Sequence, residues 1–306
     1  MGKIAFMFSG QGAQHVGMAK DLYDNYSEVK SLFDDAESIR SNTKFQCFDG
    51  DEETLKQTQN TQPCLYLADL AAALALKSEG VMPDAVAGFS LGEIPALAFA
   101  GAYSYTDGFK AAIERGKAMG KAAEENPASM LAVVKLDNET IESICQKYSD
   151  IYPVNYNCNG QLVVSGKTEQ FEAFTNDIKQ AGGRALPLKV SGGFHSPFMN
   201  SASEAFGEYL QTMDIKNPTI TAYSNYTAKA YDSEVKELLT KQINNPVRWE
   251  TTIKSLLDNG YDTFIEVGVG STLQKLCSKI ADGYENIKMF KCESTEDVKN
   301  IVNELK

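Results

Sequence analysis

Gly88-Phe89-Ser90-Leu91-Gly92 is the stretch from which the organisation of this chain can be worked out. Residues 83–87 before it predict a short buried strand, and residues 93–99 predict the start of a helix. Strand, tight Gly-x-Ser-x-Gly turn and helix form the context of a nucleophile elbow. Flanking glycines avoid Cβ clashes in such a turn, and the serine faces N–H groups at a helix N-terminus. Ser90 is therefore a candidate nucleophile, and the alternative interpretation is a purely structural turn.

Helical patterns alternate with short apolar runs along most of the chain. Such alternation predicts an α/β fold with a parallel sheet. Buried strands are expected at residues 3–9 and 263–267, besides the strand before Ser90. Helices are expected at about 17–40, 64–79 and 92–124 (with a break near Gly101), near 196–213 and 233–242, and from 271 onward.

The pattern changes at about residue 127. Six elements follow in the order β-α-β-β-α-β, which is the ferredoxin-like arrangement. We therefore predict a small ferredoxin-like subdomain over residues 127–191, inserted into a large domain made of residues 1–126 and 192–306. The six elements are expected at residues 130–134, 137–148, 151–156, 161–165, 168–181 and 185–190, with residues 157–160 as the loop between the two middle strands.

Composition excludes several classes of function. The net charge of −12 disfavours nucleic acid phosphates as a partner. No apolar run approaches the roughly 18–20 residues that cross a bilayer, and no secretion signal is evident, so neither a membrane nor export is expected. The six scattered cysteines form no Cys-x-x-Cys pair, which favours free thiols in the cytoplasm. No metal-binding or nucleotide-binding motif is present, so no cofactor is expected.

A serine nucleophile needs a base within hydrogen-bonding distance, and the chain has only two histidines. His195 follows a glycine-rich loop at the end of an expected strand, and we take it as the candidate base. His15 is interpreted as a surface residue. Because His15 stands where a dinucleotide fingerprint needs glycine, the loop at Gln11 is not a nucleotide site. We expect instead that the amides of Gln11 and Leu91 form an oxyanion hole.

Arg115 lies on an apolar helical stretch beside Glu114 and Lys117. A guanidinium suits a bidentate clamp on a substrate carboxylate. A solvated helix charge is the alternative, and the residues alone do not choose between the two.

Several motifs, spread in order over about 260 residues, together resemble the malonyl-CoA:acyl-carrier-protein transacylase family. The motif around Ser90 resembles the nucleophile motif of the family, and residues 193–196 resemble its histidine segment. The other matching segments are 8–14, Thr61-Gln62-Pro63, 115–119, Val154-Asn155-Tyr156-Asn157, Gln242 with 245–249, and 266–268.

The resemblance implies a fold and a set of roles. The large domain would be α/β-hydrolase-like, with the site between it and the small subdomain. Ser90 and His195 would form a dyad, His195 would be oriented by the backbone carbonyl of Gln242, and Arg115 would hold the malonyl carboxylate.

Three further residues are substrate-binding candidates by the same resemblance. Phe194 fits the pattern of enzymes that prefer malonyl over the bulkier methylmalonyl group. Gln62 and Asn157 lie in family motifs near the acyl group.

The implied reaction moves a malonyl group from malonyl-CoA to the phosphopantetheine thiol of acyl carrier protein, through a malonyl-serine intermediate, for fatty acid synthesis. We expect the chain to act as a monomer without a cofactor. The alternatives are an acyltransferase that serves a polyketide synthase, a serine esterase or thioesterase, and a non-catalytic scaffold for a carrier protein.

Overall fold

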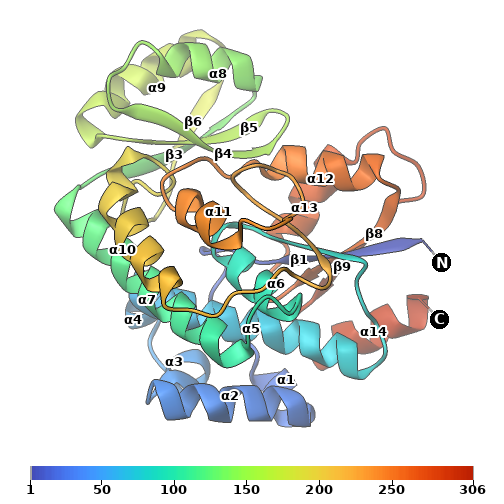
Figure 1. Ribbon diagram of the computed structural model, residues 1–306. Coiled ribbons are helices and arrows are strands. Elements are labelled where there is room, and N and C mark those ends of the chain that lie inside the picture. The colour runs from blue at the N-terminus through green and yellow to red at the C-terminus, as the bar shows by residue number, and fades with distance from the viewer. Residues whose placement is uncertain (1, 306) are drawn as a thin grey trace.

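Two β-sheets covered by helices organise residues 2–305, the part of the chain that the computed structural model describes (Figure 1). The first sheet is parallel, in the order β7-β2-β1-β8-β9, and the second is antiparallel, in the order β4-β5-β3-β6. The strands are β1 (Lys3–Phe8), β2 (Ala85–Gly88), β3 (Ser129–Val134), β4 (Ile151–Cys158), β5 (Gln161–Gly166), β6 (Arg184–Pro187), β7 (Thr221–Tyr223), β8 (Tyr261–Val267) and β9 (Lys288–Cys292). The helices are α1 (Lys20–Asn25), α2 (Ser27–Ile39), α3 (Thr43–Phe48), α4 (Glu52–Leu55), α5 (Thr58–Ser78), α6 (Glu93–Phe99), α7 (Tyr105–Glu125), α8 (Asn138–Cys145), α9 (Phe171–Gln180), α10 (Asn200–Gln211), α11 (Val235–Gln242), α12 (Trp249–Asp258), α13 (Thr272–Ile280) and α14 (Thr295–Leu305), with 3₁₀ turns η1 (Ser90–Gly92), η2 (Thr168–Gln170) and η3 (Pro197–Met199).

Strands β1 and β2, inside the parallel sheet, are buried on both faces, which explains why they are nearly continuous apolar runs. On β1, Ile4, Phe6 and Phe8 enter a core shared with α5, α6 and α7. Ala5 and Met7 point to the opposite side, into a core shared with α12 and α13. Because side chains alternate along a strand, β1 anchors both layers of the domain.

The carboxyl ends of β1 and β2 bring two sequence motifs together. The strands are parallel and pair Phe8 with Gly88, so the loop at Gln11 and the turn at Ser90 leave the same edge of the sheet. A hydrogen bond of 3.0 Å from Phe89 N–H to the Phe8 carbonyl extends the pairing into the turn. Binding sites of open α/β sheets lie at this edge.

The second sheet and its two helices form a separate layer, at the top of Figure 1. The elements follow in the order β3-α8-β4-β5-α9-β6, and α8 and α9 share a hydrophobic core with one face of the sheet. Strand β4 is joined to the segment that precedes α12, because Asn155 and Val247 form a β-bridge. Ser165 on β5 donates a hydrogen bond of 2.8 Å to the Phe194 carbonyl, so the layer also contacts the segment before His195.

Several element boundaries differ from the prediction. The helix expected at 17–40 is divided into α1 and α2, because Tyr26 has an extended backbone. Helix α5 begins at Thr58 and continues through Pro63, six residues before the predicted start. Strand β4 extends to Cys158, so the expected loop at 157–160 is wrong for its first two residues. Six elements were not predicted, namely the helices α3, α4, α12 and α14 and the strands β7 and β9.

Candidate active site

The turn at Ser90 is built by close backbone approach on both sides of the serine. A Cβ at Gly88 would lie 1.9 Å from the Gly92 carbonyl carbon, and a Cβ at Gly92 would lie 2.3 Å from the Phe8 oxygen. Both positions therefore need glycine. The left-handed residue of the turn is the serine itself, with φ of 54°. This conformation costs an L-residue about 1–2 kcal/mol, so other contacts must hold it.

Ser90 and His195, 105 residues apart, are brought into direct contact. The distance between Ser90 Oγ and His195 Nε2 is 2.7 Å, and His195 Nδ1 lies 2.9 Å from the backbone oxygen of Gln242. A carbonyl can only accept, so Nδ1 carries the proton and Nε2 is free to accept the hydroxyl proton of Ser90. This is the arrangement of a serine activated by a general base.

The surroundings of His195 favour its neutral form. The residue is only 3% exposed. Burial, together with the nearby positive charge of Arg115, lowers the pKa of His195 to about 4. At neutral pH the imidazole is therefore unprotonated and able to act as a base.

Arg115 on α7 is a buried cation beside the nucleophile. Its Nη1 donates to Gln62 Oε1 at 2.9 Å, and its Nη2 donates to Gln242 Oε1 at 2.7 Å and to Ser90 Oγ at 3.3 Å. Its Nε is buried and, among the described residues, has no hydrogen-bond partner. No carboxylate of residues 2–305 lies within ion-pair distance of it. Burial lowers the pKa of Arg115 to about 10, which still leaves it charged at neutral pH.

Gln242, at the end of α11, links the dyad to the arginine through both its main chain and its side chain. Its backbone oxygen accepts from His195, and its side-chain oxygen accepts from Arg115. Its Nε2 donates to the Ser90 carbonyl at 2.6 Å and to Glu93 Oε2 at 2.9 Å. The sequence pointed only to the backbone carbonyl of this residue.

Sequence reasoning gave no role to Glu93 or Asn225, although both are buried at the turn. Glu93 begins the otherwise apolar helix α6, and an acidic residue in such a helix is a signal that could have identified it. Burial raises the pKa of Glu93 to about 7, against hydrogen bonds from Tyr231, Gln242 and Asn225 that favour the carboxylate. Asn225 follows the three-residue strand β7, and no comparable sequence signal marks it.

The remaining candidates are Gln11, Leu91, Phe194 and Asn157. Leu91 is fully buried in the turn, and a Cβ on Gly10, next to Gln11, would lie 2.9 Å from the Phe89 carbonyl oxygen. The loop at Gln11 therefore packs along the turn, as the oxyanion hypothesis requires. Phe194 is buried in the core beside His195. Asn157 is buried on β4, and its Oδ1 has no partner among the described residues.

His15, the other histidine, is not part of this site. Its side chain is 51% exposed, and its Nε2 lies 2.6 Å from Glu293 Oε1. This agrees with the interpretation of His15 as a surface residue. Among residues 2–305, no cluster of three or more His, Cys, Asp or Glu side chains could hold a metal ion, and no helix of the same residues is long and apolar enough to cross a bilayer.

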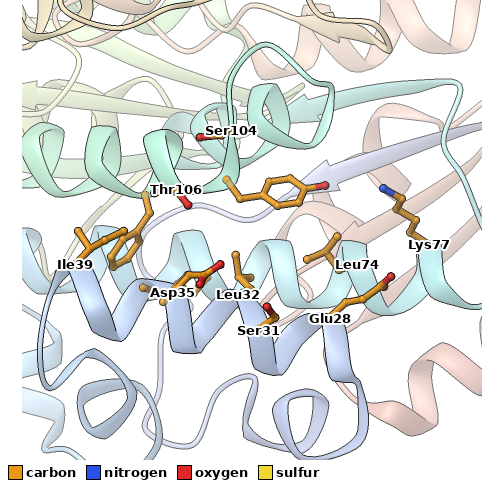
Figure 2. Close-up of a pocket in the computed structure, with 13 residues that line it drawn as sticks. Glu28, Ser31, Leu32, Asp35, Ile39, Leu74, Lys77, Ser104 and Thr106 are labelled. Carbon is orange, nitrogen blue, oxygen red and sulfur yellow. The ribbon is translucent and has the colours of Figure 1, made fainter.

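A groove of about 420 Å³ lies elsewhere, between α2, α5 and the start of α7 (Figure 2). Its apolar floor includes Leu32 and Leu74, and its rim carries Glu28, Asp35 and Lys77. Neither the dyad nor Arg115 lines it, so it is distinct from the candidate active site.

Comparison with known proteins relates the whole chain to acyl-transferring enzymes. The sequence model of the family described as "Acyl transferase domain" matches residues 5–299. The malonyl CoA-acyl carrier protein transacylase of Bacillus subtilis (strain 168) is 37% identical over 304 residues, which cover 97% of this chain and 96% of the relative.

Solved structures give the same result. The malonyl CoA-acyl carrier protein transacylase of Clostridium perfringens superposes with a TM-score of 0.94 at 34% identity, over 99% of this chain and 97% of that one. A second structure, described as a type II PKS acyl-carrier protein in complex with its malonyl-transacylase, has a TM-score of 0.93 at 30% identity and covers 99% of both chains.

Proposed function

The chain belongs to the acyl transferase domain family, and from that premise we propose that it transfers malonyl from malonyl-CoA to the phosphopantetheine thiol of an acyl carrier protein. The observation that supports this substrate is the buried cation Arg115, whose Nη2 lies 3.3 Å from Ser90 Oγ and whose Nε has no partner among residues 2–305. A free carboxylate on the acyl group would supply the missing partner at bonding distance from the reacting atoms.

In the first half-reaction, His195 Nε2 takes the proton of Ser90 as Oγ attacks the malonyl thioester carbonyl. The tetrahedral oxyanion is stabilised by the amides of Gln11 and Leu91, each such donor contributing about 2.7–4 kcal/mol. The C–S bond then breaks, and the proton on His195 passes to the coenzyme A thiolate. Malonyl-Ser90 remains, with its carboxylate on Arg115.

In the second half-reaction, the carrier thiol enters and gives its proton to His195. The thiolate attacks the serine ester, the C–O bond breaks, and Ser90 recovers the proton. An imidazole that is neutral at physiological pH can serve as the base in both halves of this ping-pong scheme, and a single acyl pose fixed by Arg115 favours transfer. In this proposal Gln62, which accepts from the guanidinium, and Phe194, which precedes His195, shape the acyl site. Asn157, whose buried Oδ1 has no partner among the described residues, is a further candidate for contact with the substrate.

We also propose a division of the chain into a large domain and an inserted subdomain. We assign residues 1–126 and 192–306 to a large α/β-hydrolase-like domain and residues 127–191 to a ferredoxin-like subdomain. The strand-to-helix turn that carries Ser90 supports the first assignment. The β-α-β-β-α-β element order and the β4-β5-β3-β6 sheet order support the second.

Fatty acid synthesis is the pathway that we assign to this activity. Supply of malonyl to a polyketide carrier is the second candidate, because a structural relative is bound to such a carrier. A serine esterase is less well supported, because hydrolysis of simple esters has no use for Arg115. Six cysteines without disulfides fit the reducing cytoplasm as the place of the reaction.

Intact mass spectrometry tests the proposal directly. Incubation with malonyl-CoA should add one malonyl group to the protein, and addition of a holo carrier protein should remove it and load the carrier. Carriers from fatty acid and polyketide pathways, compared in parallel, separate the two pathways. Rapid release of free malonate with no carrier loading would indicate a hydrolase instead, and no adduct at all would indicate a scaffold.

A further inference from the structure

The peptide groups on both sides of Ser90 are held by buried side-chain amides. Asn225 Oδ1 accepts the Ser90 N–H at 2.7 Å, and Gln242 Nε2 donates to the Ser90 carbonyl at 2.6 Å. Asn225 Nδ2 also donates to the Gly88 carbonyl at 2.6 Å. The two ends of the Asn225 amide therefore bind the main chain on either side of Phe89, and they fix the turn that directs Ser90 toward His195.

Both of these amide-bearing residues are held by one carboxylate. Glu93 Oε1 accepts the backbone N–H of Asn225 at 3.2 Å, and Glu93 Oε2 accepts from Gln242 Nε2 at 2.9 Å. The hydroxyl of Tyr231 donates to Glu93 Oε1 as well. Glu93, Asn225 and Gln242 are each 1% exposed or less, so water does not compete for these bonds.

We propose that Asn225 and Glu93 are positioning residues that hold the strained backbone of Ser90 in the conformation required for attack. The proposal rests on the proposed role of Ser90 as nucleophile. Neither residue hydrogen-bonds a side chain of the dyad, so each acts through the main chain of the turn or through Gln242.

The contacts predict different kinetic effects for the two residues. Asn225 binds only the turn through its side chain, so its loss should slow acylation and leave malonyl binding intact. Glu93 also fixes Gln242, which in turn holds Arg115, so its loss should affect both acylation and malonyl binding. A residue that merely stabilises the fold would change the active fraction and not the rate constant of that fraction.

The test is single-turnover formation of the malonyl-enzyme, followed by rapid quench and intact mass spectrometry at several malonyl-CoA concentrations. Asn225→Ala should lower the acylation rate constant about 10- to 100-fold and leave the half-saturating concentration within about threefold of the parent. Glu93→Gln should lower the rate constant and also raise the half-saturating concentration. Glu250→Gln is the matched control, because Glu250 is a buried carboxylate whose partners, Asn138 and Lys254, lie outside the site.

Asn225→Asp gives a second signature and keeps the shape of the side chain. When ionised, the introduced carboxyl repels the Gly88 carbonyl, and when protonated it can donate to it as the native amide does. The ratio of variant to parent acylation rate should therefore rise as the pH falls from about 8 to about 6. If Asn225 only stabilised the fold, this ratio of acylation rates would not rise at low pH.

The outcomes separate this proposal from the proposed function. If the parent forms no malonyl-enzyme, the proposed function fails. If the parent is acylated but the Asn225 and Glu93 variants keep its rate constant, with only the amplitude reduced, the positioning role is overturned. A ratio for Asn225→Asp that does not change with pH also overturns it.

Discussion

Replacing Arg115 by methionine is the sharpest test of how the site selects its substrate. Methionine keeps an apolar stem in the buried position and removes the guanidinium, including the Nε that has no partner among the described residues. If Arg115 binds the malonyl carboxylate as proposed, the variant loses a contact made by Nε and by Nη2, the atom that lies 3.3 Å from Ser90 Oγ in this structure. With acetyl-CoA, no such contact exists to lose.

The expected loss of preference for malonyl follows from the number of hydrogen bonds to its carboxylate that the substitution removes. A hydrogen bond to a charged group contributes about 1.5–3 kcal/mol, so two contribute about 3–6 kcal/mol. Since about 1.4 kcal/mol corresponds to tenfold, the preference for malonyl over acetyl should fall about 100-fold or more. We expect a change near 100-fold, the lower end of this range, because Nη2 must give up part of its contact with Ser90 Oγ to bind the substrate. Loss of the bonds to Gln62 and Gln242 affects both substrates and cancels in the ratio.

The assay is the second-order rate constant of acylation with each acyl-CoA at about pH 8. At this pH His195 is neutral in both proteins, although removal of the Arg115 charge raises its pKa. Lys117→Met is the control, because Lys117 is exposed on the same helix and pairs only with Glu114. Equal losses with malonyl-CoA and acetyl-CoA would refute the assignment of Arg115 as the carboxylate clamp.

Three further predictions concern the dyad and its neighbour. Ser90→Ala should form no malonyl-enzyme by intact mass, and an adduct on that variant would indicate another nucleophile. The pKa of His195 is about 4 in the folded protein and ordinarily 6.5, so as the pH falls through this range the unfolded chain takes up a proton before the folded one does. The free energy of unfolding of the parent therefore decreases as the pH falls from about 6.5 to about 4. Urea unfolding should show His195→Gln gaining about 2 kcal/mol relative to the parent between pH 7 and pH 5, and a pH-independent difference would contradict this burial. Phe194→Ser should raise the rate with methylmalonyl-CoA relative to malonyl-CoA in a competition assay. An unchanged ratio of the two rates would contradict the assignment of Phe194 to the acyl site.

The sequence predicted those parts of the site that depend on local backbone geometry. The turn at Ser90 needs glycines on both sides, because Gly88 and Gly92 approach other backbone atoms too closely for a Cβ. Such a requirement leaves a short, recognisable motif between a strand and a helix. The scarcity of histidine then reduced the choice of base to two residues. His195, the candidate, does lie 2.7 Å from the serine.

Strand β7 and the first residues of helix α5 were missed because their local signals are weak. Strand β7 has three residues and lies at the edge of the sheet, so it shows no periodicity of its own. Helix α5 extends back through Pro63 to Thr58, although Pro63 has no N–H to donate to the residue four positions earlier, and proline is ordinarily a signal that a helix ends. Asn225 lies two residues after the end of β7, and only the three-dimensional pairing of β7 with β2 brings it to the turn. A role that depends on such long-range pairing leaves no motif in the chain.

The use of neutral amides around Arg115 has a physical reason. A carboxylate within reach of the guanidinium would form an ion pair with it and compete with the carboxylate of the substrate. Glu93 is the charged group that influences Arg115 from within the site, and the amide of Gln242 stands between them, accepting from Arg115 and donating to Glu93. His195 is likewise oriented by the carbonyl of Gln242 and not by an aspartate. In the proposed mechanism the same residue therefore positions the base and keeps carboxylates away from the cation, which would allow the dyad to work without an acidic third member.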